Sequence, residues 1–161
     1  MNNNAPVGIM DSGLGGVSVL REAVKQLRNE SFIYYGDNKN APYGSRTPDD
    51  IEALAFASAR FLVDKGVKAL VVACNTATSA AIDDMRRAFK LPVVSMEPAI
   101  KPALAYTSGK VLMLATDATC KLERYRKLKE RLDANGRVTD IGCTALVEAV
   151  ESGAKSEAIS A

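Results

Sequence analysis

The hydrophobic positions of this chain fall into six short runs that alternate with segments of helical spacing. The clearest run, residues 69–73, holds five small or apolar residues and leads directly into Cys74. An unbroken apolar run of this length is typical of a strand that is covered on both faces. Residues 77–86 then have the pattern of a helix. We therefore expect Cys74 at the carboxyl end of a buried strand and immediately before a helix.

The remaining runs continue the same alternation along the chain. Thr47 and Pro48, followed by two acidic residues, form a typical helix start, and Asn135-Gly136 forms a typical helix end. Regular alternation over this length predicts an α/β fold with a doubly wound, mainly parallel sheet of about six strands and helices on both faces. The other predicted strands are 7–10, 32–35, 92–96, 110–115 and 137–142, and the other predicted helices are 17–27, 47–63, 99–107, 120–134 and 145–152.

Short polar clusters follow the predicted strands at their carboxyl ends. In open α/β sheets, ligands bind at that edge, so one edge of the sheet is expected to carry the ligand. The clusters are Asp11-Ser12, Asp37, Cys74-Asn75-Thr76, Thr116 to Thr119 and Cys143-Thr144.

The first cluster opens a glycine-rich turn, residues 11–16, which matches neither GxGxxG nor GxxxxGK[ST]. A nucleotide site is therefore weakly supported. Glycines let the backbone approach a ligand closely. Alternatively, Asp11 or Ser12 caps the helix that follows, and the sequence leaves both interpretations open.

Cys74 also has two interpretations. A helix amino end favours negative charge and can lower a thiol pKa from about 8.5 into a range where thiolate exists at neutral pH, but the sequence does not give the pKa of this thiol. The alternative is a small buried thiol that only packs in the core. The polar neighbours Asn75 and Thr76 favour a functional thiol.

Composition narrows the chemistry. With 161 residues, 47% of them hydrophobic, the chain is long enough for one full core. The net charge of +2 and the lack of a dense basic stripe argue against nucleic acid or a membrane surface as partner, and leave a small anionic metabolite open. No apolar run reaches membrane-spanning length and no signal peptide is evident, so a cytoplasmic protein is expected.

The chain contains no histidine. Cys-His and Ser-His-Asp nucleophiles and histidine-ligated metals are thereby excluded within it. The three cysteines, 74, 120 and 143, have no CxxC spacing, and the last two are expected to be structural. No cofactor or metal is predicted. A thiol held as thiolate could abstract a proton from carbon, while Ser12, Ser45, Asn75 and Thr76 could hold the carboxylate of an amino acid.

Several segments, in this order and spacing, resemble the amino-terminal half of the glutamate racemases, in the aspartate/glutamate racemase family. They are Val7 to Gly16, Tyr35 to Asp37, Ala41 to Arg46, Ala73 to Ala77, Glu97-Pro98, Ala115 to Thr119 and Val147 to Gly153.

This resemblance implies a cofactor-independent interconversion of L- and D-glutamate by two cysteines on opposite faces of the α-carbon. The D-glutamate would serve peptidoglycan synthesis, and hence the cell wall and cell shape. Cys74 matches the first cysteine, Asp11 would assist its thiol, and Glu151 matches an acidic residue near the site. The remaining residues that would hold glutamate are Ser12, Pro42, Tyr43, Gly44, Ser45, Asn75, Thr76 and Thr119.

The family's second cysteine has no counterpart here, and Cys143 matches a segment that precedes it. We therefore expect residues 1–152 to form an amino-terminal racemase-like domain, residues 153–161 to be the truncated start of a hinge or second domain, and this chain alone to be inactive. The resemblance is compatible with a homodimer. The alternatives are a non-catalytic binding or regulatory domain for an acidic amino acid or a partner protein, and a related aspartate or hydantoin racemase.

Overall fold

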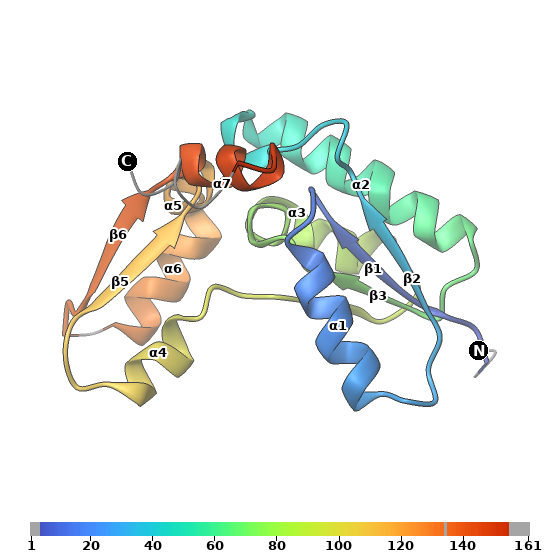
Figure 1. The fold of residues 1–161 in the computed structure, drawn as a ribbon, viewed down its shortest axis with the longest axis horizontal. Helices are drawn as coiled ribbons and strands as arrows, with labels where there is room; N and C mark the ends of the chain where they lie inside the picture. Colours follow the sequence, from blue (N-terminus) through green and yellow to red (C-terminus); the bar gives the residue numbers. More distant parts are fainter. Residues whose placement is uncertain (1–3, 134, 155–161) are drawn as a thin grey trace.

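The computed structural model describes residues 4–133 and 135–154 (Figure 1). Six parallel strands alternate with helices, so the predicted α/β class is confirmed. The strands are β1 (Val7–Asp11), β2 (Phe32–Gly36), β3 (Ala69–Val72), β4 (Val93–Ser95), β5 (Val111–Ala115) and β6 (Val138–Gly142). The helices are α1 (Gly16–Gln26), α2 (Pro48–Asp64), α3 (Asn75–Ala88), α4 (Ile100–Tyr106), α5 (Asp117–Lys121), α6 (Glu123–Leu132) and α7 (Thr144–Glu151), with a short 3-10 helix at Tyr43–Ser45.

The prediction of one continuous sheet is wrong. The strands form a four-stranded sheet in the order β2-β1-β3-β4 and a separate two-stranded sheet of β5 and β6. Figure 1 shows the two sheets side by side, joined by the long segment that follows β4. The hydrophobic pattern identifies each strand but not its neighbour, because pairing depends on contacts between distant segments.

The four-stranded sheet is covered on both faces, as predicted. Ile9 and Met10 are adjacent in β1 and both fully buried, although successive side chains point to opposite faces of a strand. Helix α1 lies on one side of this sheet in Figure 1, and α2 and α3 lie on the other. The main core lies between the sheet and α2 and α3, where Met10, Leu70 and Val72 meet Leu62 and Met85.

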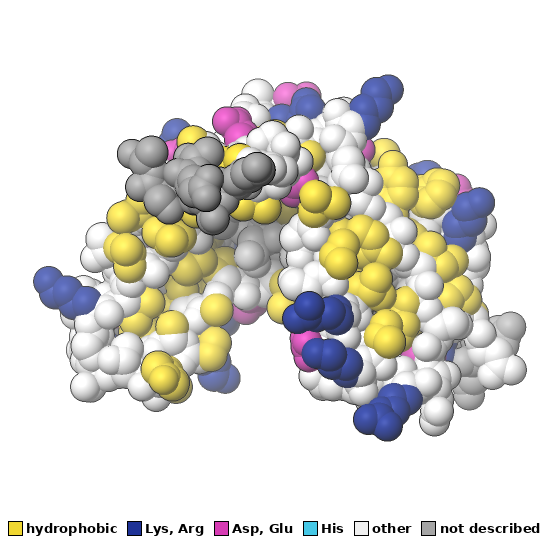
Figure 2. All heavy atoms as spheres, in the orientation of Figure 1, with side chains coloured by type: hydrophobic (Ala, Val, Ile, Leu, Met, Phe, Trp, Pro, Cys, Tyr) yellow, Lys and Arg dark blue, Asp and Glu magenta, His cyan; other side chains and the backbone are white. Residues whose placement is uncertain are grey.

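The two-stranded sheet is covered on one face only, which corrects the expectation of helices on both faces. Val111 and Met113 pack with Ile100 of α4, Tyr125 of α6 and Val138 in a second, smaller core. The alternate positions Leu112, Leu114 and Ile141 are 57%, 52% and 43% exposed. Hydrophobic side chains are accordingly visible over this sheet in Figure 2.

Local helix signals were mostly correct. Thr47 caps α2 by accepting a hydrogen bond from the Asp50 amide, with Pro48 in the first turn. The predicted bounds of helix 120–134 are wrong. The observed helical segment begins earlier, at Asp117, and is interrupted at Leu122, whose backbone is extended. Residue 134, the predicted end of that helix, lies outside the described residues.

Left-handed glycines follow three of the helices, with Gly66 at a φ of 80° just beyond α2. Gly136 has a φ of 64° beyond α6, as Asn135-Gly136 predicted, and Gly153 has a φ of 72° beyond α7. Such values favour glycine because it has no Cβ.

Of the predicted tail, residues 155–161 lie outside the described residues. In the described part of the chain, no helix is both long and apolar enough to cross a membrane.

Candidate functional site

Cys74 lies at the junction of β3 and α3, as the sequence predicts. Its backbone is extended, with φ −78° and ψ 120°, and it is the amino-terminal cap of α3. The helix begins two residues earlier than expected, at Asn75, because the Cys74 sulfur itself accepts a hydrogen bond from the Ala77 amide at 3.4 Å. The thiol is therefore fixed at the amino end of a helix.

The Cys74 side chain is buried, with 6% of its surface exposed. Its Sγ donates a hydrogen bond to Ser12 Oγ at 3.3 Å. Since Ser12 follows β1 and Cys74 follows β3, neighbouring parallel strands bring the two side chains together at one edge of the sheet. This contact confirms that the first and third polar clusters meet.

The sequence leaves open in which direction folding shifts the pKa of Cys74. Burial raises the pKa of Cys74, and the negative charge of Asp11 raises it further. Hydrogen bonds with Ser12 and Ala77 act in the opposite direction but do not compensate. The desolvation of a buried thiolate outweighs the helix amino end here, so the sulfur carries its proton at neutral pH.

Asp11 holds the glycine-rich turn. Its Oδ2 accepts hydrogen bonds from the amides of Gly13 at 3.1 Å and Gly16 at 3.0 Å. Gly15, the residue at the cap position of α1, makes no side-chain cap. Asp11 therefore does what the capping interpretation predicted, and Ser12 instead contacts the thiol.

Thr76 connects the two sheets. Its Oγ1 lies 2.9 Å from Thr119 Oγ1 and 3.1 Å from Thr116 Oγ1, and the hydroxyls of Thr116 and Thr119 lie 2.9 Å apart. The predicted residues Thr76 and Thr119 are thus brought together, both buried, in a cluster of three hydroxyls with the half-buried Thr116. Thr116, which the site prediction omitted, caps α5, and its position at the end of β5 was the signal for it.

The loop 42–45 lies beside this cluster. A Cβ on Gly44 would come within 2.5 Å of Thr116 Cβ, so the loop backbone lies directly against the start of α5. Gly44 and Ser45 line a cavity of about 450 Å³ together with Asp117 and Thr144. The loop therefore helps to form a pocket between the two sheets.

The side chain of Tyr43 does not line that pocket. It is 1% exposed and donates a hydrogen bond to Asp37 Oδ2 at 2.8 Å, with Ser58 Oγ 3.5 Å away. Burial, with the neighbouring Asp37 adding to it, raises the pKa of Tyr43 above its usual range. Tyr43 therefore anchors the loop in the core, and Asp37 is the partner that fixes it.

Glu151 reaches the glycine-rich turn from α7. Its carboxylate accepts a hydrogen bond from the Leu14 amide, with Oε1 3.0 Å from the nitrogen. Pro42, Leu14 and Glu151 line a second cavity, of about 310 Å³. Asn75, in the first turn of α3, is exposed. The predicted residues thus surround the Cys74 end of the sheet without all touching one another.

The arrangement as a whole places a protonated thiol, several hydroxyls and the amino end of α3 at the meeting point of the two sheets. Helix amino ends bind carboxylates, and a thiol is able to donate or accept a proton. The surface is hollowed between the two sheets (Figure 2). In the described ranges, 4–133 and 135–154, no three Cys, Asp or Glu side chains form a metal-binding group.

The fold and the site define an α/β protein of parallel sheets with a thiol at a strand-to-helix junction. A model of the Asp/Glu/Hydantoin racemase family matches residues 7–160. The chain belongs to this family.

Individual relatives agree with that assignment. A glutamate racemase of Clostridium perfringens is 48% identical over 152 residues, which cover 93% of this chain and 58% of the relative. The crystal structure of a glutamate racemase isoform from Bacillus anthracis superposes with a TM-score of 0.82 at 34% identity, covering 92% of this chain and 57% of that one.

A further solved structure has a ligand. The glutamate racemase of Francisella tularensis, crystallised in complex with D-glutamate, superposes with a TM-score of 0.79 at 33% identity, covering 93% of this chain and 57% of that protein. The chain therefore spans a little under three fifths of the length of the relatives that it matches.

Proposed function

We propose that this chain is the Cys74-bearing part of a glutamate racemase, which interconverts L- and D-glutamate by thiol-based proton transfer without a cofactor. The observation that carries the proposal is the buried Cys74, hydrogen-bonded to Ser12 at 3.3 Å and fixed at the amino end of α3. The glutamate racemases among its relatives support glutamate as the substrate, rather than aspartate or a hydantoin. The product would enter peptidoglycan synthesis in the cytoplasm.

Each residue of the site has a proposed role. Cys74 exchanges a proton with the α-carbon of glutamate. Asp11 holds the glycine-rich turn that positions Ser12, and its charge adds to the effect of burial in raising the pKa of the thiol. The substrate would be held by Ser12, Pro42, Tyr43, Gly44, Ser45, Asn75, Thr76, Thr119 and Glu151, with Tyr43 acting through the position of its loop.

Inversion at carbon needs a base on one face and an acid on the other, each within hydrogen-bond reach. Cys74 supplies one of these groups. The thiol of Cys143 donates to the Ala115 carbonyl at 3.4 Å, and Cys120 is a partly buried residue of α5. We therefore propose that residues 1–161 alone bind glutamate but do not racemise it, and that residues 1–152 are the amino-terminal unit of a longer enzyme, compatible with a homodimer.

Incubation with L-glutamate in deuterated water tests this proposal. We expect binding by calorimetry, no formation of D-glutamate, and weaker or lost exchange of the α-proton in Cys74→Ser. Racemisation by the isolated chain that is lost in Cys74→Ser would refute the need for a second thiol. Racemisation that persists in Cys74→Ser would refute the role of Cys74 itself.

The raised pKa of Cys74 favours a second candidate, a binding domain without chemistry, because a protonated thiol is a poor base. Such a domain would hold an acidic amino acid or a partner protein at the same edge. Glutamate affinity that is unchanged in Cys74→Ala, together with no α-proton exchange at any pH, would favour this alternative.

A further inference from the structure

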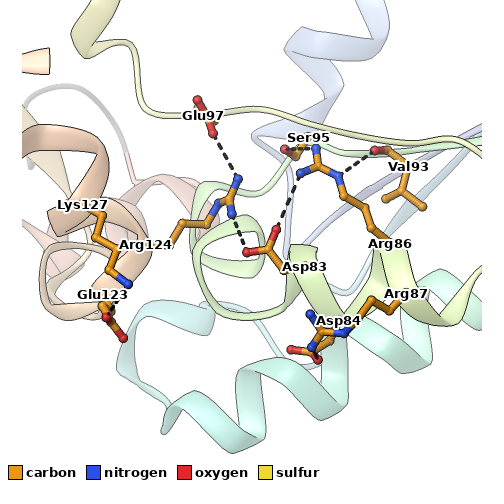
Figure 3. A network of polar contacts seen from close by, with 10 residues as sticks. All are labelled: Asp83, Asp84, Arg86, Arg87, Val93, Ser95, Glu97, Glu123, Arg124 and Lys127. Carbon is orange, nitrogen blue, oxygen red and sulfur yellow. Dashed lines mark hydrogen bonds and ion pairs between the residues drawn. The ribbon is translucent and has the colours of Figure 1, made fainter. Parts of the chain in front are cut away.

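Arg124 of α6 forms an ionic connection between the two sheets, in addition to the contacts of the threonine cluster. Its guanidinium donates from Nη1 to Asp83 Oδ2 of α3 at 2.6 Å and from Nη2 to Glu97 Oε1 at 3.2 Å. Figure 3 shows Arg124 between these two carboxylates. Because Glu97 lies in the segment that joins β4 to α4, one side chain binds both the α3 layer and the connection itself.

The network continues into the four-stranded sheet. Arg86 of α3 lies 3.8 Å from Asp83 and donates to the carbonyl of Val93 at 3.2 Å and to Ser95 Oγ at 3.4 Å. Asp83 therefore lies between two guanidinium groups, that of Arg86, which is hydrogen-bonded to β4, and that of Arg124 on α6 (Figure 3). The side chain of Arg124 is 29% exposed, less than either carboxylate, so the guanidinium side of both ion pairs is partly shielded from water.

The two connections lie at different heights on α3. Thr76 is in the first turn of the helix, and Asp83 lies seven residues later, about 10 Å along the axis. Their partners, Thr119 and Arg124, lie on α5 and α6 on either side of the extended Leu122. Two polar contacts at different heights on α3 restrict the rotation of the α5–α6 unit about either one of them, and the Glu151 carboxylate on the Leu14 amide is a further contact between the sheets.

We propose that Arg124 is a positioning residue: together with Asp83 and Glu97 it forms an ionic latch that sets the angle between the two sheets and so holds Thr119 against Thr76 beside Cys74. The part of this inference that concerns glutamate rests on the proposed function. The orientation part stands on the contacts alone, since loss of the latch leaves the three threonines as the polar contact between α3 and the α5–α6 unit.

A matched control lies on the same helix. Arg87 pairs with Asp84 three residues away, so this ion pair stays within α3 and connects nothing else (Figure 3). Arg87→Met and Arg124→Met remove the same charge and keep a similar apolar stem. They differ in whether the lost ion pair crosses between the sheets.

Amide residual dipolar couplings of the 161-residue chain measure the angle directly. We expect one alignment tensor to fit the amides of both sheets in the wild type and in Arg87→Met, and two tensors to be needed in Arg124→Met. A single common tensor in Arg124→Met would overturn the latch. This readout requires no ligand, so it decides the orientation part even if the chain does not bind glutamate and the proposed function fails.

Glutamate affinity then tests the positioning role. Partly exposed ion pairs contribute modestly, so the dissociation constant should rise about fivefold in Arg124→Met and stay unchanged in Arg87→Met. Both variants should unfold at the same denaturant concentration, which separates orientation from global stability. An unchanged affinity in Arg124→Met, with two tensors observed, would refute the link between the latch and the site.

Discussion

The Oγ1 atoms of Thr76 and Thr119 lie 2.9 Å apart, although the first belongs to α3 and the second to α5, on the other side of the break between the sheets. Both side chains are buried. Thr119→Val keeps the shape and removes the hydroxyl, which should destabilise the chain by about 1 kcal/mol. Urea denaturation would measure the loss.

The exposed Thr139 of β6 offers a control for that substitution. Thr139→Val should change stability by no more than about 0.5 kcal/mol. Equal effects of the two substitutions would contradict a role of the buried hydroxyl cluster in joining the sheets.

Gly44 is expected to tolerate no side chain. The Cβ of Gly44→Ala would meet Thr116 Cβ and Cγ2 at 2.5 Å, so the loop must move away from α5, at a cost of about 1 to 3 kcal/mol. Gly109→Ala is the control, because its nearest neighbour would be 3.4 Å away. Denaturation of the two variants in parallel checks the prediction, and a neutral Gly44→Ala would disprove the close approach.

Asp11 is expected to control the acidity of Cys74. Its charge is one cause of the raised thiol pKa, so Asp11→Asn should lower the pKa of Cys74. The ultraviolet absorbance of the thiolate reports the titration, in a background where Cys120 and Cys143 are replaced by Ser. Asp49→Asn, on the exposed first turn of α2, serves as control and should leave the titration unchanged.

Cys74 should also make stability depend on alkaline pH. Folding raises the pKa of Cys74. The contribution of its protonated thiol to the free energy of unfolding is therefore complete below the pKa of the unfolded chain, about 8.5, and is lost as the pH rises toward the pKa in the folded chain. In that window the unfolded chain releases the proton first, and stability should fall by up to about 1.4 kcal/mol per pH unit.

Urea denaturation at a series of pH values from neutral to alkaline, on the wild type and Cys74→Ser, measures this dependence. Tyr125, whose pKa is also raised, titrates in both proteins and cancels in the difference. The pKa values of Tyr34 and Tyr43 are raised chiefly by burial and least by the charge of Cys74, so only that small last part differs between the two proteins. Parallel curves would mean that folding does not raise the pKa of Cys74.

Local signals predicted local structure well. The apolar run before Cys74 and the capping residues at Thr47 concern neighbours in the chain, and strand and cap lie where expected. The helix predicted from residue 120 differs from the observed one because Thr116 caps a helix that begins at Asp117 and the extended Leu122 interrupts it, and the apolar spacing carries neither signal.

The site was predicted as a set of positions at the carboxyl ends of strands, and Cys74, Ser12, Thr76 and Thr119 do contact one another in pairs. The direction of the Tyr43 side chain was not predictable, since it depends on Asp37 and Ser58 in the fold. The same applies to Thr116, whose contact with Thr76 crosses between the sheets.

By itself, the sequence determined the alternation of strands and helices, the place of Cys74 between a strand and a helix, and the absence of any imidazole, because these follow from neighbouring residues or from composition. Only the tertiary structure decided that the strands divide into two sheets, that Asp11 caps α1, and that the Cys74 thiol keeps its proton. Strand pairing, burial and the proximity of charges each depend on residues that lie far apart in the chain, so a local sequence pattern does not determine them.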